Sequence, residues 1–173
     1  MRKIILALIV VIFTLTAILL IAGTLKKINR QNQARERIST LPVFSFMTIS
    51  DENFSSSEIK KGPVLIVRFH PDCEHCQYEL TEIMKSDIPV IAEKVILISS
   101  AHPDSIRKFL GTLNYLDYPS IIALADTLYT FREIFGNDIV PSNYIYNKEL
   151  NLVKVLSGEV RTETILKYLV EGE

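Results

Sequence analysis

A short apolar run directly before the chain's only two cysteines most constrains how this sequence can fold. The run, VLIVRF, spans Val64–Phe69 and is almost continuously apolar, a pattern typical of a strand that is buried on both faces. Cys73 and Cys76 follow it, and the residues from Cys73 to Ser86 have the pattern of a helix. We therefore expect the cysteines at the carboxyl end of a buried strand. In α/β sheets, binding and catalytic sites gather at this edge.

Strands and helices alternate along the rest of the C-terminal part. The expected strands cover residues 43–49, 64–69, 94–100 and 120–125, with a terminal hairpin over 142–147 and 150–158. The expected helices cover residues 73–86, 103–113, 127–136 and 162–172. This order predicts an α/β fold with helices against a central sheet. The apolar stripes expected to face the core are Ile83, Ile88 and Ile91, and Ile165, Leu166 and Leu169.

A long uncharged segment precedes this domain. From Ile4 to Leu25 there is no charged residue, and a helix of that length spans about 33 Å, enough for the ~30 Å hydrocarbon core of a bilayer. A cleavable signal peptide is the alternative, but its apolar region has roughly 7–15 residues. Leu20 and Ile21 also stand where its cleavage site needs a small residue. We therefore expect a transmembrane anchor within residues 1–25.

The polar residues 26–40 are expected to form a juxtamembrane stalk, and residues 41–173 the globular domain. Basic residues after the apolar segment favour a cytoplasmic domain by the positive-inside rule. The short amino end and the cysteine pair favour the opposite side, because an oxidising compartment suits such a pair. We expect a single-pass protein of the cytoplasmic membrane with an extracytoplasmic (periplasmic) domain. A net charge of −1 gives no indication of nucleic-acid binding.

The spacing of the cysteines suits thiol chemistry. The first turn of a helix has unpaired N–H groups and the positive end of the helix dipole, which stabilise a thiolate. Cys73 is therefore the expected nucleophile, and Cys76, one turn deeper, the expected resolving thiol. Two intervening residues leave the thiols close enough to bridge. Protonated His75 favours the thiolate and a more oxidising pair, whereas Glu74 works in the opposite direction.

This stretch resembles the active site of the thioredoxin superfamily, and it is most similar to the membrane-anchored TlpA-like and ResA-like thiol-disulfide oxidoreductases. The matching features are the strand followed by Cys73-Glu74-His75-Cys76 at a helix start, Glu79 three residues later, and Val140-Pro141 directly before the strand around Tyr144–Tyr146. The final hairpin and helix also match, and the likeness covers residues 41–173.

The resemblance implies a thioredoxin-like mixed sheet flanked by helices, and disulfide exchange with protein thiols of the cell envelope without cofactor or metal. It implies that Glu79 carries protons near the thiols and that Pro141 forms a cis-proline loop against the disulfide. The sequence departs from the family at several positions. These are Asp72 for the usual tryptophan, Val67 for a buried carboxylate, His75 for the motif's proline, and Ser142-Asn143 after Pro141. They leave the client proteins and the redox direction open.

Other interpretations of these residues remain. A single C-x-x-C is also half a zinc site, and zinc needs four ligands, so a copper or zinc chaperone would have to use a histidine: His70, His75 or His102. An inert disulfide in a redox-inactive, tethered interaction domain is a further alternative. Glu79 is otherwise a surface carboxylate, and Pro141 an ordinary turn proline with a trans bond. His70 and Asp72 flank the site, where they would either adjust its electrostatic field or be loop residues only, and His102 is expected only to start a helix.

Overall fold

The computed structural model describes residues 13, 15–25, 33 and 35–172, and the chain divides into two units, Met1–Glu36 and Arg37–Glu173. In the first unit, residues 15–25 are helical and most of their apolar side chains are exposed. Within the described part of the chain, no helix is long and apolar enough to cross a membrane. The predicted anchor and stalk fall partly on residues 1–12, 14, 26–32 and 34, which lie outside the described residues.

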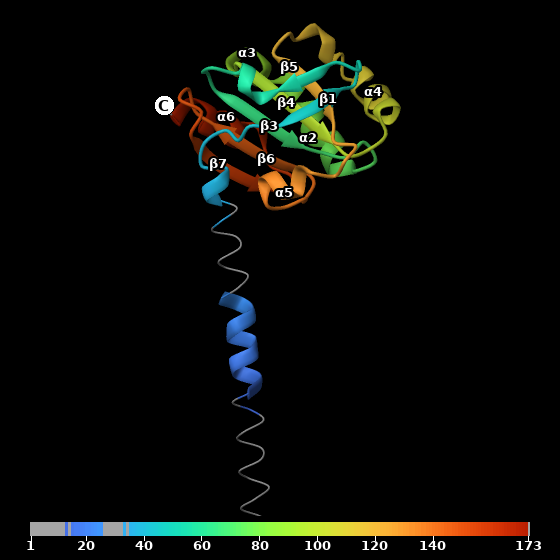
Figure 1. The fold of residues 1–173 in the computed structure, drawn as a ribbon. Helices are drawn as coiled ribbons and strands as arrows, with labels where there is room; N and C mark the ends of the chain where they lie inside the picture. Colours follow the sequence, from blue (N-terminus) through green and yellow to red (C-terminus); the bar gives the residue numbers. More distant parts are fainter. Residues whose placement is uncertain (1–12, 14, 26–32, 34, 173) are drawn as a thin grey trace, which may run out of the picture. The chain divides into compact units, whose positions relative to one another are not determined.

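The second unit is built on a sheet that has seven strands within the described residues, in the order β2-β1-β5-β4-β3-β6-β7 (Figure 1). The strands are β1 (Ser45–Thr48), β2 (Asn53–Ser55), β3 (Val64–Arg68), β4 (Lys94–Ser99), β5 (Ile121–Ala125), β6 (Ser142–Tyr146) and β7 (Leu152–Ser157). The β3–β4 and β4–β5 pairs are parallel, and all other pairs are antiparallel. The sheet is therefore mixed, as the resemblance implies.

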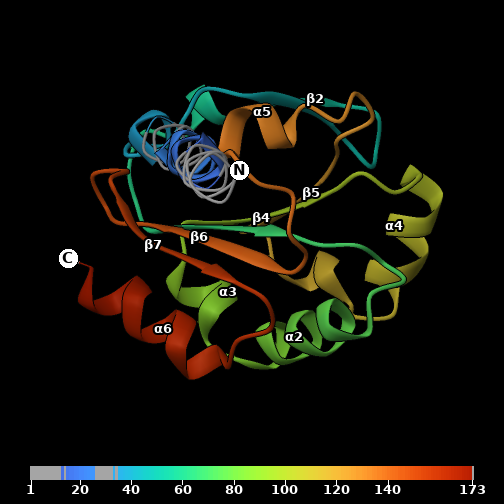
Figure 2. The same cartoon turned by 90° about the horizontal axis from the view of Figure 1, so that it is seen from below.

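Helices cover both faces of this sheet, with α2, α3 and α6 on one face and α5 on the other (Figure 2). The helices are η1 (Ser56–Glu58), α2 (Glu74–Lys85), α3 (Ile88–Ile91), α4 (Pro103–Gly111), η2 (Tyr115–Asp117), α5 (Phe131–Phe135) and α6 (Thr162–Glu171). Along β3, Leu65 and Val67 face the α2 side, whereas Val64 and Ile66 face the other. Because β3 is buried on both faces, its sequence is almost continuously apolar.

The helix predicted over residues 127–136 is shorter in the structure. The carboxylate of Asp126 accepts the backbone N–H groups of Thr130 and Phe131, at 2.8 and 3.2 Å, and α5 begins only at Phe131. Tyr129, just before it, has a positive φ of 57°, which a continuous helix does not allow. The predicted end is confirmed, because Gly136 adopts the left-handed conformation that closes the helix.

The prediction of a core position is wrong for Ile91. Ile83 and Ile88 are fully buried, but Ile91 is 40% exposed. The reason is a break after α2, where the hydroxyl of Ser86 accepts the N–H of Ile88 and a separate short helix, α3, begins. The structure also forms β2 around Phe54, which is buried between exposed or half-exposed neighbours.

The compact unit begins at Arg37 rather than at the expected Leu41. Ile38 is buried among the apolar side chains of the α5 face. Thr40 forms a β-bridge with Asn151, and the backbone N–H of Leu41 donates to the carbonyl of Leu150 at 2.8 Å. The end of the predicted stalk is therefore part of the domain, because its backbone pairs with the hairpin.

Replacing Ile66 with alanine is expected to lower the free energy of unfolding by about 2–5 kcal/mol, because the side chain is fully buried in a central strand. Val90→Ala is the matched control, since Val90 is 76% exposed, and its effect should stay within about 0.5 kcal/mol. Chemical denaturation of both variants measures the difference. Equal effects of the two substitutions would contradict the position of β3 in the core.

Candidate functional site

The two cysteines lie where β3 gives way to α2. The short segment that joins the strand to the helix turns at His70, whose carbonyl accepts the backbone N–H of Cys73 at 3.1 Å. Cys73 is the N-cap residue of α2, with an extended backbone, and its Sγ accepts the backbone N–H of Cys76 at 3.3 Å. The sulfur therefore takes the position in which serine or aspartate oxygen normally caps a helix. This confirms the prediction that Cys73 lies at the positive end of a helix.

The two thiols differ in accessibility. Both are free, and Cys73 is partly exposed whereas Cys76 is fully buried. Burial raises the pKa of Cys76 to about 12; hydrogen bonding to Cys73 adds to the rise, and a backbone hydrogen bond at His70 opposes it. Cys73 can thus be reached from solvent, while Cys76 remains a protonated thiol in the reduced state. This asymmetry suits the roles predicted for an attacking and a resolving thiol.

Glu79 is buried, and the alternative of a surface carboxylate is wrong. Its side chain lies one helical turn after Cys76 and is only 1% exposed. The Oε1 atom accepts a hydrogen bond from Asn143 Nδ2 at 2.9 Å, and the Oε2 atom accepts one from the backbone N–H of Val160 at 2.7 Å. The charge of Glu79 also contributes to the raised pKa of Cys76. The ionised carboxylate of Glu79 therefore disfavours ionisation of the buried thiol.

Burial also raises the pKa of Glu79 above its ordinary value of 4.5. The hydrogen bonds from Asn143 and Val160 oppose this rise, and the nearby negative charge of Glu159 adds to it. A buried carboxyl group with a perturbed pKa beside a buried thiol is a group that can hold and transfer a proton.

Pro141 lies at the same edge of the sheet as the cysteines. The Val140–Pro141 peptide bond is cis, as the resemblance predicts. In the antiparallel pairing of β6 with β3, Ser142 is opposite Arg68, so the start of β6 adjoins the end of β3. Val140 and Cys73 both pack against the apolar cluster that contains Cys76. The loop before β6 and the start of α2 therefore border one site.

The loop that leads into Pro141 is held by a buried arginine that the sequence analysis did not single out. Arg68 is 2% exposed, and its Nε donates to Asp138 Oδ1 at 2.9 Å. Its guanidinium group also forms ion pairs with Asp138 at 2.7 Å and with buried Asp126 at 3.8 Å, and it lies 4.8 Å from the centre of the Phe131 ring. A buried charge is tolerated when it is paired in this way. The sequence does carry a signal for this role, because Arg68 is the one charged residue inside the apolar run of β3.

The two residues between the cysteines differ in their contacts. Glu74 is exposed in the first turn of α2. His75 Nδ1 lies 2.6 Å from Oε2 of Glu159, which precedes α6, and the two side chains are 75% and 38% exposed. Sequence reasoning identified His75 but not its partner, because Glu159 follows the last strand and carries no local signal of its role.

The histidines available for a metal site have other contacts. His70 Nδ1 accepts the backbone N–H of Asp72 at 3.2 Å, and His102 caps α4 by accepting the N–H of Asp104 at 3.3 Å. Among the described residues, no group of three or more His, Cys, Asp or Glu side chains is arranged to hold a metal ion. The geometry therefore gives no specific support to the metal-chaperone interpretation.

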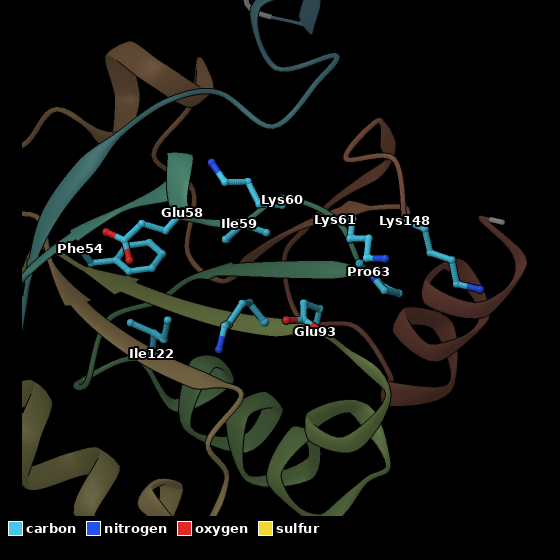
Figure 3. A pocket seen from close by; sticks show the side chains of 11 residues that line it. Phe54, Glu58, Ile59, Lys60, Lys61, Pro63, Glu93, Ile122 and Lys148 are labelled. Atoms are coloured by element: carbon cyan, nitrogen blue, oxygen red, sulfur yellow. The ribbon is translucent and has the colours of Figure 1, made fainter.

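A groove of about 740 Å³ lies at the opposite edge of the sheet (Figure 3). It is lined by the residues that lead into β3 and β4 and by Lys148 of the β6–β7 turn, and it includes neither cysteine. Figure 3 shows the side chains of Lys60 and Lys148 pointing in different directions. Lys60 and Lys148 therefore do not converge on a common ligand position, and the candidate site remains the edge with the cysteines.

No protein-family model and no curated protein matches this sequence. Solved structures do match. DsbF from Mycobacterium tuberculosis, in mixed oxidized and reduced forms, has a TM-score of 0.63 at 17% identity, covering 78% of this chain and 96% of that one. The exposed lipoprotein thioredoxin of Streptococcus pneumoniae has a TM-score of 0.57 at 24% identity, covering 75% and 98%. A thiol:disulfide interchange protein of Chlorobium tepidum has a TM-score of 0.63 at 15% identity, covering 77% and 94%. The chain therefore contains a thioredoxin-like fold.

The raised pKa of Glu79 predicts a pH dependence of stability. Because the folded state holds this proton more tightly than the unfolded state, the stabilisation is complete below about pH 4.5 and is lost as pH rises through the folded-state pKa. Glu79→Gln should remove this component. The substitution can keep the contact with Asn143. Among the described residues, Asn143 Oδ1 has no hydrogen-bond partner, so the Asn143 amide can flip and accept a hydrogen bond from the side-chain N–H of the substituted glutamine.

The measurement is the free energy of unfolding of both proteins as a function of pH. We expect the wild type to lose stability relative to Glu79→Gln as pH rises above 4.5. Glu82→Gln is the control on the same helix, since Glu82 is 38% exposed and pairs with Lys85, and its profile should follow the wild type. Parallel profiles for Glu79→Gln and wild type would contradict the burial of Glu79.

The difference between the thiols predicts selective alkylation. At pH 8, the reduced Cys76→Ser variant, which keeps Cys73, should react with iodoacetamide at least roughly a hundredfold faster than Cys73→Ser, because the thiolate is the reactive form. A pKa of about 12 keeps Cys76 protonated. Mass spectrometry of timed samples gives both rates, and unfolding in guanidinium should make them similar. Similar rates in the folded proteins would count against the assignment.

Proposed function

We propose that this protein is a thiol-disulfide oxidoreductase whose Cys73 and Cys76 alternate between a dithiol and a disulfide. One observation carries the proposal: a partly exposed cysteine caps α2, and its mate is fully buried one turn later. The thioredoxin-like fold supports it, and the similar structures include a thiol:disulfide interchange protein. We further propose the TlpA-like and ResA-like branch, on the sequence features around Glu79 and Pro141.

In the reducing direction, the Cys73 thiolate attacks one sulfur of a client disulfide. The client S–S bond breaks, its second sulfur leaves as a thiolate, and a mixed disulfide forms on Cys73. Cys76 then loses its proton and attacks the Cys73 sulfur. The Cys73–Cys76 bond forms, the client's first sulfur leaves, and two electrons have passed to the client. The same steps in reverse donate a disulfide to the client.

Glu79 is proposed to accept the proton that Cys76 releases. With a pKa of about 12, the buried Cys76 thiol does not ionise readily without a base. Glu79 lies one turn along the same helix, and its carboxylate accepts hydrogen bonds from Asn143 and Val160. These hydrogen bonds favour the ionised carboxylate, whereas burial favours the protonated one. The two effects suit a group that gains and loses a proton during each cycle.

The protein is also proposed to act outside the cytoplasmic membrane. The uncharged run Ile4–Leu25 supports an uncleaved anchor, and the clients would then be thiols and disulfides of cell-envelope proteins. Two similar structures carry names consistent with such a location, an exposed lipoprotein thioredoxin of Streptococcus pneumoniae and a secreted disulfide oxidoreductase of Mycobacterium tuberculosis.

Trapping the intermediate tests this proposal. Cys76→Ser should accumulate a covalent mixed disulfide between Cys73 and a client disulfide, because no second thiol remains to displace the client. Cys73→Ser should trap nothing and lose disulfide-reducing activity. Non-reducing electrophoresis and mass spectrometry detect the adduct, with the variant that lacks both cysteines as a blank. Trapping by Cys73→Ser but not by Cys76→Ser would contradict the assigned order.

A further inference from the structure

Glu159, which lies outside the cysteine motif, contacts a residue inside it. His75 Nδ1 and Glu159 Oε2 are 2.6 Å apart. A carboxylate oxygen accepts hydrogen bonds, so the imidazole Nδ1–H donates to it. We propose that Glu159 is a positioning residue that holds the His75 imidazole away from Cys73 and thereby keeps the Cys73–Cys76 couple more reducing. This inference rests on the proposed function.

Without its contact to Glu159, the His75 imidazole could act on the Cys73 thiolate. It is two residues after the N-cap residue Cys73, in the first turn of α2. We infer that a change of side-chain rotamer alone would bring its imidazole toward the Cys73 sulfur. An N–H donor stabilises a thiolate, whether the imidazole is neutral or charged. A thiolate stabilised in this way favours the reduced form and makes the couple more oxidising.

The backbone on both sides of Glu159 is held in place by hydrogen bonds to the site. On one side of it, the backbone N–H of Gly158 donates to the carbonyl of Pro141 at 2.9 Å. On the other side, the N–H of Val160 donates to Glu79 Oε2 at 2.7 Å. Gly158 has a φ of +83°, which favours glycine in this turn. The loop carrying Glu159 is thus tied to the cis-proline loop and to the buried carboxyl group.

Glu159 also lies among other charged side chains, so its contact with His75 has to be distinguished from the general effect of its charge. Its carboxylate contributes to the raised pKa of Glu79. Other charged side chains near it line a groove of about 500 Å³ between α2 and the start of α6, namely Glu82, Arg161 and Glu163. Glu163 therefore offers a carboxylate in the same groove for comparison, while Glu159 is the one paired with His75.

The test is the redox equilibrium of the full chain with glutathione at pH 7. Glu159→Gln should shift the equilibrium constant two- to fivefold toward the reduced protein, the size of an exposed ion pair. This corresponds to about 10–20 mV more oxidising. The shift should disappear when Glu159→Gln is introduced into a His75→Ala background. Glu163→Gln is the matched control and should keep the wild-type potential.

The outcomes separate this inference from the proposed function. If the wild type forms no reversible Cys73–Cys76 disulfide, the proposed function fails. If the couple forms but Glu159→Gln leaves its potential unchanged, the inference alone is wrong. A full shift in the His75→Ala background would also overturn it, because Glu159 would then act through its charge and not through His75. An equal shift in Glu163→Gln would lead to the same conclusion.

Discussion

The hydrogen bond from the Cys76 backbone N–H to the Cys73 sulfur is the contact on which the rest of the site depends. It makes the partly exposed Cys73 the N-cap residue of α2, and Cys76, in the first turn of that helix, lies inside the core. The position of this helix start is fixed by β3, which is buried on both faces and paired with β4 and β6. A one-residue slip of this strand would turn buried Arg68 to the opposite face of the sheet and break its contact with Asp138.

Four further contacts bring distant segments to the same sheet edge. Arg68 binds Asp138, which belongs to the loop that leads into Pro141. Glu79 binds Val160 and Asn143, and the Gly158 N–H binds the carbonyl of Pro141. Each contact uses a buried or half-buried polar group that would be unfavourable without its partner. The same hydrogen bonds that satisfy these groups therefore position the loops around the thiols.

The fold and the placement of the cysteines could be predicted because their signals are local. An apolar run of six residues marks β3, and the helical pattern after it identifies the start of α2. The contacts of the site could not be predicted, because they join residues far apart in the sequence: 70 residues between Arg68 and Asp138, 81 between Glu79 and Val160, and 84 between His75 and Glu159. Helical spacing placed Glu79 near Cys76, but its burial depends on segments from the other end of the chain.

The central claim is that Cys73 and Cys76 form one reversible disulfide. It is tested most directly by equilibrating the protein across a series of thiol-disulfide buffers, quenching with acid, and mapping the linked peptides by mass spectrometry. The account predicts a single two-electron transition in which Cys73 and Cys76 of the same chain become bonded to each other. Buffer adducts or links between chains, with no Cys73–Cys76 bond at any buffer ratio, would contradict it.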